Sequence, residues 1–286
     1  GLVGPILNLN YPYIQISKSL TSLNDILDNK SEFSKVFYNA KHPLIIIGTS
    51  AINNDQGSSI IKVCAEIAKK LPNYSNSFNP LNILNQDISR VGSLELGFVN
   101  KDFDCDFKKK LKEKIIKNKP VVFLLGLDEV DSKSLEGSFV VYIGHHGDIN
   151  AQDADVILPT PAYTEKSSTF MNIEGRLIQT SRCHNPLGDA KEEWKIFRVL
   201  SDLLDCDIEF NNLNDVRKKL VDYNKNFIEL LELKSSSNLS FASKEHIKEH
   251  NLSYNITNFY MNDSISRSSE TMAKCTNEIL NKAKAS

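Results

Sequence analysis

The sequence predicts an α/β fold, a parallel sheet with helices on both faces, followed by a mostly helical, polar C-terminal extension. Short apolar runs rich in β-branched residues are uninterrupted, as is typical of strands that are covered on both faces. Helical patterns separate these runs, which favours parallel pairing through right-handed crossovers. Beyond about residue 206 the apolar runs give way to polar helical patterns. We therefore expect an α/β domain at 1–206 and a helical extension and tail at 207–286.

Four apolar runs are the predicted strands. They lie at 44–48, 121–126, 139–144 and 155–158. We expect the runs that begin near Leu44, Val121 and Val140 to belong to one parallel sheet. Three of the runs end in glycine and lead into polar loops, and ligands of open α/β sheets bind at such carboxyl ends.

Four segments carry a helical pattern. They lie at 60–71, where Pro72 ends the apolar stripe, and at 107–117, 189–204 and 213–233. The lysines of the second segment are interpreted as a solvated face. In the third, Asp189 and Glu192 have the spacing of a capping box, which predicts that Asp189 caps the helix. A Ser-rich break at 234–240 is the best candidate for a linker.

Composition excludes several classes of function. The 34 basic and 36 acidic residues leave a net charge of −2, which gives no support to nucleic-acid binding. The longest apolar runs, at 44–47 and 121–125, are far shorter than the roughly 20 residues of a membrane helix. The five cysteines are scattered, with no CxxC pair for zinc or an iron–sulfur cluster. Neither GxGxxG nor a P-loop occurs.

Two histidine patterns are weighed for chemistry. His145 and His146 follow a predicted strand, and Asp148 could orient one of them. Adjacent side chains on an extended backbone point to opposite sides, so we favour loop histidines over a metal site. Residues 246–250 read His-Ile-Lys-Glu-His, formally the HxxEH pattern of a zinc peptidase. It lies in a polar tail, so a peptidase is kept only as a distant alternative.

Longer stretches carry a resemblance to a known family. They are 155–159, 163–167 and 172–176 with Gln179, and further 141–148, 194–201, 259–267 and 272–275. Together they closely resemble the large iron–sulfur (75 kDa) subunits of mitochondrial respiratory complex I, within the molybdopterin-oxidoreductase superfamily. The resemblance runs in order along essentially the whole chain.

This resemblance implies a structural, non-catalytic part of the peripheral arm of complex I, on the matrix side of the mitochondrial inner membrane. That arm supports electron transfer from NADH to ubiquinone. The implied partners are other complex I subunits, including a chain that carries the N-terminal iron–sulfur part. The clusters are expected there, and no cofactor is expected in this chain. The alternative is the cofactor-binding half of an active molybdopterin oxidoreductase.

The opening residues from Gly1 resemble the interior of the molybdopterin-like domain. If the first half of that domain is elsewhere, we expect this chain to expose sheet edges and apolar surface, and to be poorly soluble alone.

A loop network is the predicted structural feature of the best-matched stretch. Its members are Glu165, Asn172, Glu174 and Arg176. We expect Arg176 to pair with Glu165 or Glu174, because a guanidinium and a carboxylate form strong parallel hydrogen bonds. None of the four is predicted to be a catalytic, cofactor-binding or metal-binding residue.

Overall fold

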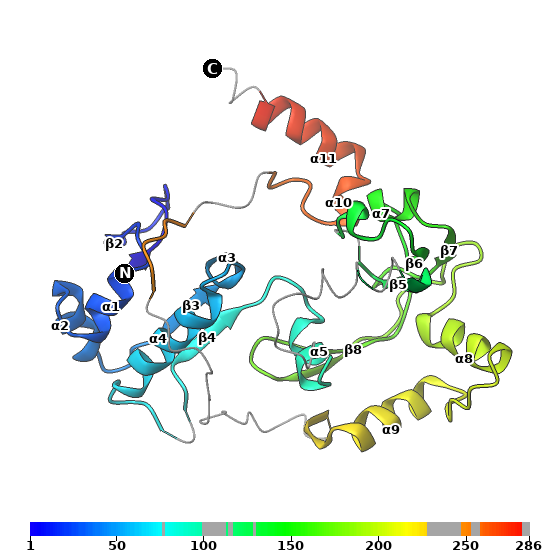
Figure 1. Cartoon of the computed structure of the whole chain (residues 1–286), viewed down its shortest axis with the longest axis horizontal. Coiled ribbons are helices and arrows are strands. Elements are labelled where there is room, and N and C mark those ends of the chain that lie inside the picture. Colours follow the sequence, from blue (N-terminus) through cyan, green and yellow to red (C-terminus); the bar gives the residue numbers. More distant parts are fainter. Residues whose placement is uncertain are drawn as a thin grey trace. The chain divides into compact units, whose positions relative to one another are not determined.

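The computed structural model describes residues 1–75, 78–98, 113, 117–127, 130–227, 247–252 and 258–281. These form two compact units (Figure 1). The first unit contains residues 1–92, 171–176 and the described part of 231–257, and the second contains the other described residues. The division between the two units falls within short elements. It falls within helix α5 (Arg90–Glu95) and within the pair formed by β8 (Thr169–Met171) and β9 (Leu177–Gln179). The predicted division at 206/207 stays a prediction.

The first unit is built around a parallel pair of strands. Strand β3 (Ile45–Gly48) pairs with β4 (Leu81–Leu84), with Ile45 opposite Leu81 and Gly48 opposite Leu84. Helix α4 (Gly57–Lys69) packs its predicted apolar stripe against Ile47, with Ile60, Cys64 and Ile67 in the same buried cluster. Burial of the Cys64 thiol raises its pKa to about 12.

Short elements complete the first unit. They are β1 (Leu2–Val3), β2 (Gln15–Ser17), α1 (Ser22–Leu27), α2 (Glu32–Tyr38) and α3 (Thr49–Ile52). Leu20 and Ile26 join the apolar cluster of α4, so this core draws on segments that lie before and after β3.

The second unit contains a three-stranded parallel sheet in the order β5–β6–β7. The strands are β5 (Val121–Leu125), β6 (Phe139–Gly144) and β7 (Val156–Pro159), close to their predicted positions. On one face, Leu124, Val140 and Tyr142 pack with Ala151 of α7 (Ile149–Gln152). On the other, Phe123 lies 6.5 Å from the ring of Phe197 in α8 (Glu193–Leu203). The predicted parallel pairing and the α/β class are confirmed.

The sheet prediction missed one strand. Strand β3 pairs with β4, which was missed because Asn82 interrupts a run of only four residues. The expectation that β3 belongs to one sheet with β5 and β6 stays a prediction. The apolar runs of the β5–β6–β7 sheet are only partly buried: Phe123 and its neighbours Val121 and Leu125 are exposed in β5, and Phe139 is exposed at the start of β6. An uninterrupted apolar run indicates burial on two faces, and the described residues supply only part of it.

The helical predictions differ from the structure mainly at their ends. Helix α8 begins at Glu193 without a side-chain cap, so the predicted capping by Asp189 was wrong. The carboxylate of Glu192 instead accepts a hydrogen bond from the indole of Trp194, 3.0 Å away. Helix α9 (Leu213–Tyr223) is capped by Asn212, followed by a 3-10 turn at Lys225–Phe227. Most of the predicted helix at 107–117 and the linker at 234–240 lie outside the described residues.

The last described segment is helical. It contains α10 (Ser264–Arg267), α11 (Glu270–Cys275) and a π-helical turn at Thr276–Asn281. Among the described residues, no helix is long and apolar enough to cross a membrane.

Candidate functional site: the carboxyl edge of the β5–β6–β7 sheet

The end of β6 is closely packed around Gly144. A side chain at this position would collide with the ring of Tyr142, which is buried, so only glycine fits here. The carbonyl oxygen of Gly144 accepts a hydrogen bond from the N–H of Thr160, at 2.9 Å, just beyond β7. This bond joins the ends of two parallel strands and forms a rigid edge, from which the next residues project.

His145 and His146 lie on this edge, and their side chains converge. The two Nδ1 atoms are 2.7 Å apart, and the rings meet edge to face with centroids separated by 4.9 Å. The prediction that they point to opposite sides was wrong, because the chain bends after Gly144 and the alternation of a strand no longer applies. Both side chains are exposed, and no group of three metal-ligating side chains occurs among the described residues.

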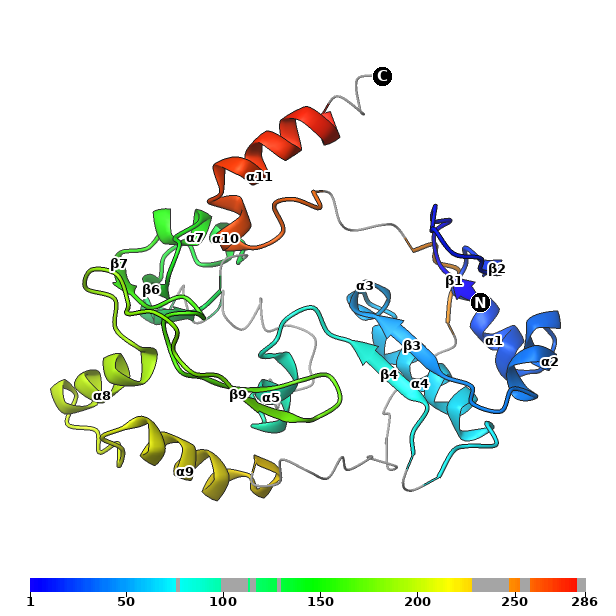
Figure 2. The same cartoon turned by 180° about the vertical axis from the view of Figure 1, so that it is seen from behind.

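Asp148 joins this edge to the C-terminal segment. One carboxylate oxygen accepts the N–H of Ile149 at 2.9 Å and caps α7, while the other forms an ion pair with Nε of Arg267. The side chains of Asp148 and Arg267 are only 17% and 24% exposed. In Figures 1 and 2, α10 lies beside α7 in both views. The two predicted family stretches at 141–148 and 259–267 therefore meet at one contact.

Helix α10 is held in place by a capping box. The carboxylate of Asp263 accepts the N–H groups of Ile265 and Ser266, and the hydroxyl of Ser266 accepts the N–H of Asp263. These hydrogen bonds, led by the one from the Ser266 backbone, hold the pKa of Asp263 below its usual value, with a smaller contribution from Arg267. The cap fixes the last turn of α10, which presents Arg267 to Asp148.

The predicted loop network is organised by Asn172. Its Oδ1 accepts the N–H groups of Glu174 and Arg176 at 3.0 and 2.9 Å, and its Nδ2 donates to the Glu174 carboxylate. Gly175 occupies the turn with a φ of 80°, a left-handed conformation that suits glycine. The exposed Arg176 joins through its backbone, and among the described residues its guanidinium forms no ion pair.

The fourth member, Glu165, belongs to the second unit. Its carboxylate accepts the N–H of Ala162 at 3.1 Å, which closes a local turn. The Arg176–Glu174 pair is thus not formed in this structure, and the network as a whole stays a prediction.

The HxxEH pattern does not have the helical setting that a zinc peptidase needs. His246 lies outside the described residues, and residues 247–250 are not helical. Ile247 is buried in the core of the first unit, and the carbonyl of His250 accepts the N–H of Leu20 at 3.0 Å. The segment serves as an extended strap on that core.

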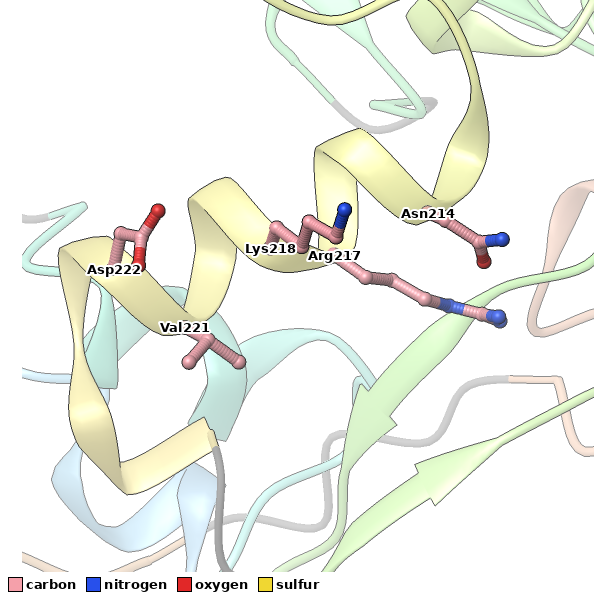
Figure 3. A pocket seen from close by; sticks show the side chains of 5 residues that line it. All are labelled: Asn214, Arg217, Lys218, Val221 and Asp222. Carbon is pink, nitrogen blue, oxygen red and sulfur yellow. The ribbon is translucent and has the colours of Figure 1, made fainter.

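A surface hollow of about 350 Å³ lies along α9 (Figure 3). Its five lining residues, Asn214, Arg217, Lys218, Val221 and Asp222, all come from this one helix. A hollow with a single wall encloses no ligand, so it is an open helix surface.

A larger apolar cavity of about 440 Å³ lies in the first unit, beside β3 and α4. At roughly 24 cal/mol per Å³, a closed empty cavity of this size would cost on the order of 10 kcal/mol. That upper limit is comparable to the whole stability of a small domain. The cavity opens to solvent, which lowers the cost but leaves apolar surface in water.

Two family models match the chain. Residues 1–203 match the model described as molybdopterin oxidoreductase, and residues 228–275 match the model of the C-terminal region of the NADH-ubiquinone oxidoreductase G subunit. The chain belongs to the molybdopterin oxidoreductase family. In this family member, the Asp148–Arg267 pair joins the first matched region to the second, which the sequence alone did not predict.

Curated relatives agree with the resemblance that the sequence carries. The chain is 35% identical over 280 residues to the NADH-ubiquinone oxidoreductase 75 kDa subunit of Reclinomonas americana, covering 96% of this chain and 40% of that protein. It is 38% identical to the 78 kDa mitochondrial subunit of Candida albicans, over 82% and 33% of the two chains. It is 31% identical to the NADH-quinone oxidoreductase G subunit of Rickettsia typhi, over 94% and 38%. The chain thus spans two fifths or less of these relatives.

At the carboxyl edge of the β5–β6–β7 sheet, two groups that could bind a phosphate-bearing cofactor are already engaged by Asp148. A phosphate-bearing cofactor needs free N–H donors or basic side chains at such an edge. Here the N-terminus of α7 is already capped by the carboxylate of Asp148, and the basic Arg267 is paired with the same carboxylate. The charges of Asp148 and Arg267 are therefore paired with each other at this edge.

Proposed function

We propose that this chain is a structural, non-catalytic part of the peripheral arm of respiratory complex I, on the matrix side of the mitochondrial inner membrane. It supports electron transfer from NADH to ubiquinone by holding its neighbours in position. The observation that carries the proposal is the Asp148–Arg267 pair, which binds a region of the complex I G-subunit type to a molybdopterin-like region. The pair occupies the edge where an active relative would place its ligand.

The cysteine environments support a role without a metal. Cys64 is buried and its pKa is raised to about 12, which disfavours the thiolate that a metal would need. Cys183 and Cys206 are exposed and belong to different segments, and Cys105 lies outside the described residues. We therefore propose that the iron–sulfur clusters lie in a partner part of the complex and that this chain binds none.

The proposed partners are other complex I subunits, including the polypeptide that carries the N-terminal iron–sulfur part. The relatives support this, because their names place them in NADH-ubiquinone and NADH-quinone oxidoreductases and this chain covers at most 40% of the three compared above. No nucleic acid is proposed as a partner, given the net charge of −2.

The test is isolation of the native assembly. The chain, detected by an antibody or a tag, should co-migrate on a native gel with NADH dehydrogenase activity, and mass spectrometry should identify complex I subunits in the same band. Metal analysis of the purified chain should find no stoichiometric iron, zinc or molybdenum. Migration apart from that activity would refute the proposal, and stoichiometric molybdenum would favour an active molybdopterin oxidoreductase.

A further inference from the structure

The inference concerns His145 and His146 at the carboxyl edge of the β5–β6–β7 sheet. Divergent side chains were the reason to expect no metal here, and the structure removes that reason, because the two Nδ1 atoms converge to 2.7 Å. Both side chains are exposed, so an ion can reach them from solvent. Imidazole nitrogen is a preferred ligand of zinc, copper and nickel.

The backbone is fixed on both sides of this histidine pair. Before it, the carbonyl oxygen of Gly144 accepts the N–H of Thr160 at 2.9 Å. After it, Gly147 adopts a left-handed turn with a φ of 57°, and Asp148 caps α7 and pairs with Arg267. Two ligands that rigid elements hold close together lose less freedom when an ion binds. Both oxygens of Asp148 are engaged, so the two imidazoles are the ligands that this edge offers.

The spacing of the two nitrogens indicates the coordination geometry. With an ion about 2.0–2.1 Å from each nitrogen and 2.7 Å between them, the angle at the ion is about 80–85°. Neighbouring ligands of a square-planar ion lie at about 90°, whereas a tetrahedral ion would spread the nitrogens to about 3.3 Å. Square-planar and tetragonal nitrogen sites are typical of Cu(II) and Ni(II).

We propose that His145 and His146 together bind one Cu(II) or Ni(II) ion through their Nδ1 atoms, with water in the other positions. Without the ion, a hydrogen bond between the same two atoms holds the rings together, so one Nδ1 carries a proton. When the ion binds, that ring carries its proton on Nε2 instead, and the exposed rings turn until both lone pairs face the ion.

The site goes beyond the proposed function, in which this chain binds no iron–sulfur cluster. Structural zinc sites use four protein ligands and catalytic sites use three. Two ligands hold an ion less tightly, so we expect the ion to be lost during purification and to be restored by addition of the metal.

Titration of the purified, chelator-treated chain with Ni(II), followed by calorimetry, tests the site. Ni(II) is the probe for affinity because Cu(II) would oxidise the exposed thiols of Cys183 and Cys206. His145→Ala and His146→Ala should each lower the affinity at least about tenfold, because the second ligand of a pair binds intramolecularly. The matched control is His42→Ala, which removes an exposed histidine without a histidine neighbour and should leave the affinity unchanged.

Two further measurements examine geometry and folding. Electron paramagnetic resonance of bound Cu(II), recorded after iodoacetamide has blocked the accessible thiols, should show a tetragonal signal with nitrogen couplings from two imidazoles. Without metal, the three variants should unfold at the same denaturant concentration as the unmodified chain, because the replaced side chains are exposed.

Four results would overturn the proposal. They are no saturable Ni(II) binding by the unmodified chain, equal affinity in either variant of the pair, an equal loss in His42→Ala, and a Cu(II) signal with a single imidazole. Tighter binding of Zn(II) than of Ni(II) would contradict the tetragonal geometry. Co-migration with NADH dehydrogenase activity tests the proposed function separately, so that function can stand when this site fails.

Discussion

Asp148 and Arg267 are separated by 119 positions in the sequence, yet their side chains form a partly buried ion pair at the end of β6. The same carboxylate caps α7, so one residue satisfies a helix end and binds the C-terminal segment. Removal of either partner leaves a charge in a site with little access to water. The pair therefore ties the order of α10 to the order of the sheet edge.

Arg267→Ala should lower the free energy of unfolding of the purified chain by about 2 kcal/mol. This lies between the values for exposed pairs, below about 1 kcal/mol, and for fully buried pairs, about 3–5 kcal/mol. Chemical denaturation followed by circular dichroism measures the change. Lys30→Ala is the matched control, because Lys30 pairs with Asp28 in an exposed setting and should change stability by less than about 1 kcal/mol. Equal losses in the two variants would contradict the assignment.

Asp263→Ala should release α10 and expose the segment 258–281 to limited proteolysis. The loss of an N-cap costs about 1 kcal/mol, and Asp263→Asn should retain most of the cap. Unchanged cleavage rates in Asp263→Ala would show that the cap does not hold this segment.

Acid should weaken the same cap. The pKa of Asp263 is lower in the folded chain than in the unfolded chain, so its carboxylate contributes stability above the unfolded pKa of about 3.9. That contribution is lost as the pH falls through the lower folded value. Proteolysis of 258–281 with an acid-active protease, scanned below pH 5, should rise less steeply in Asp263→Asn, which has no carboxylate to protonate. Identical pH profiles would argue against this role.

Thiol labelling should distinguish the buried cysteine from the exposed ones. At pH 8, iodoacetamide should modify Cys183 and Cys206 rapidly, while Cys64, with its pKa near 12 and its buried sulfur, should react only on unfolding. Mass spectrometry of the separate peptides with and without urea measures this. Fast labelling of Cys64 in the native chain would mean that the core around α4 is open.

Asn172 and Arg176 should differ in their effects on the loop. Asn172→Ala removes an acceptor of two backbone N–H groups and should destabilise the purified chain by about 1 kcal/mol. Arg176→Ala removes an exposed guanidinium and should lower the free energy of unfolding by less than Asn172→Ala does.

In the assembled complex we still expect Arg176→Ala to lower the amount of complex and not its turnover, measured as NADH–quinone activity per assembled complex. Normal assembly without turnover would indicate a working site.

The sequence alone determined four of the strands, the parallel class and the family resemblance, because each depends on local patterns of apolar residues or on long motifs. The run at 139–144 became β6 at those same residues, and the stripe from Ile60 became α4. Short-range periodicity suffices for such elements, since it sets which side chains share a face.

Only the tertiary structure decided which distant residues meet. Three of these contacts depend on how the chain turns between its elements. They are the pairing of β3 with β4, the convergence of His145 and His146, and the ion pair of Asp148 with Arg267. The expected partner of Arg176 illustrates the same limit: a carboxylate close in sequence was available, but the turn at Gly175 was organised by the neutral amide of Asn172 instead. Sequence patterns predict what a residue can bind, and the path of the backbone selects which of the available partners comes within hydrogen-bonding distance.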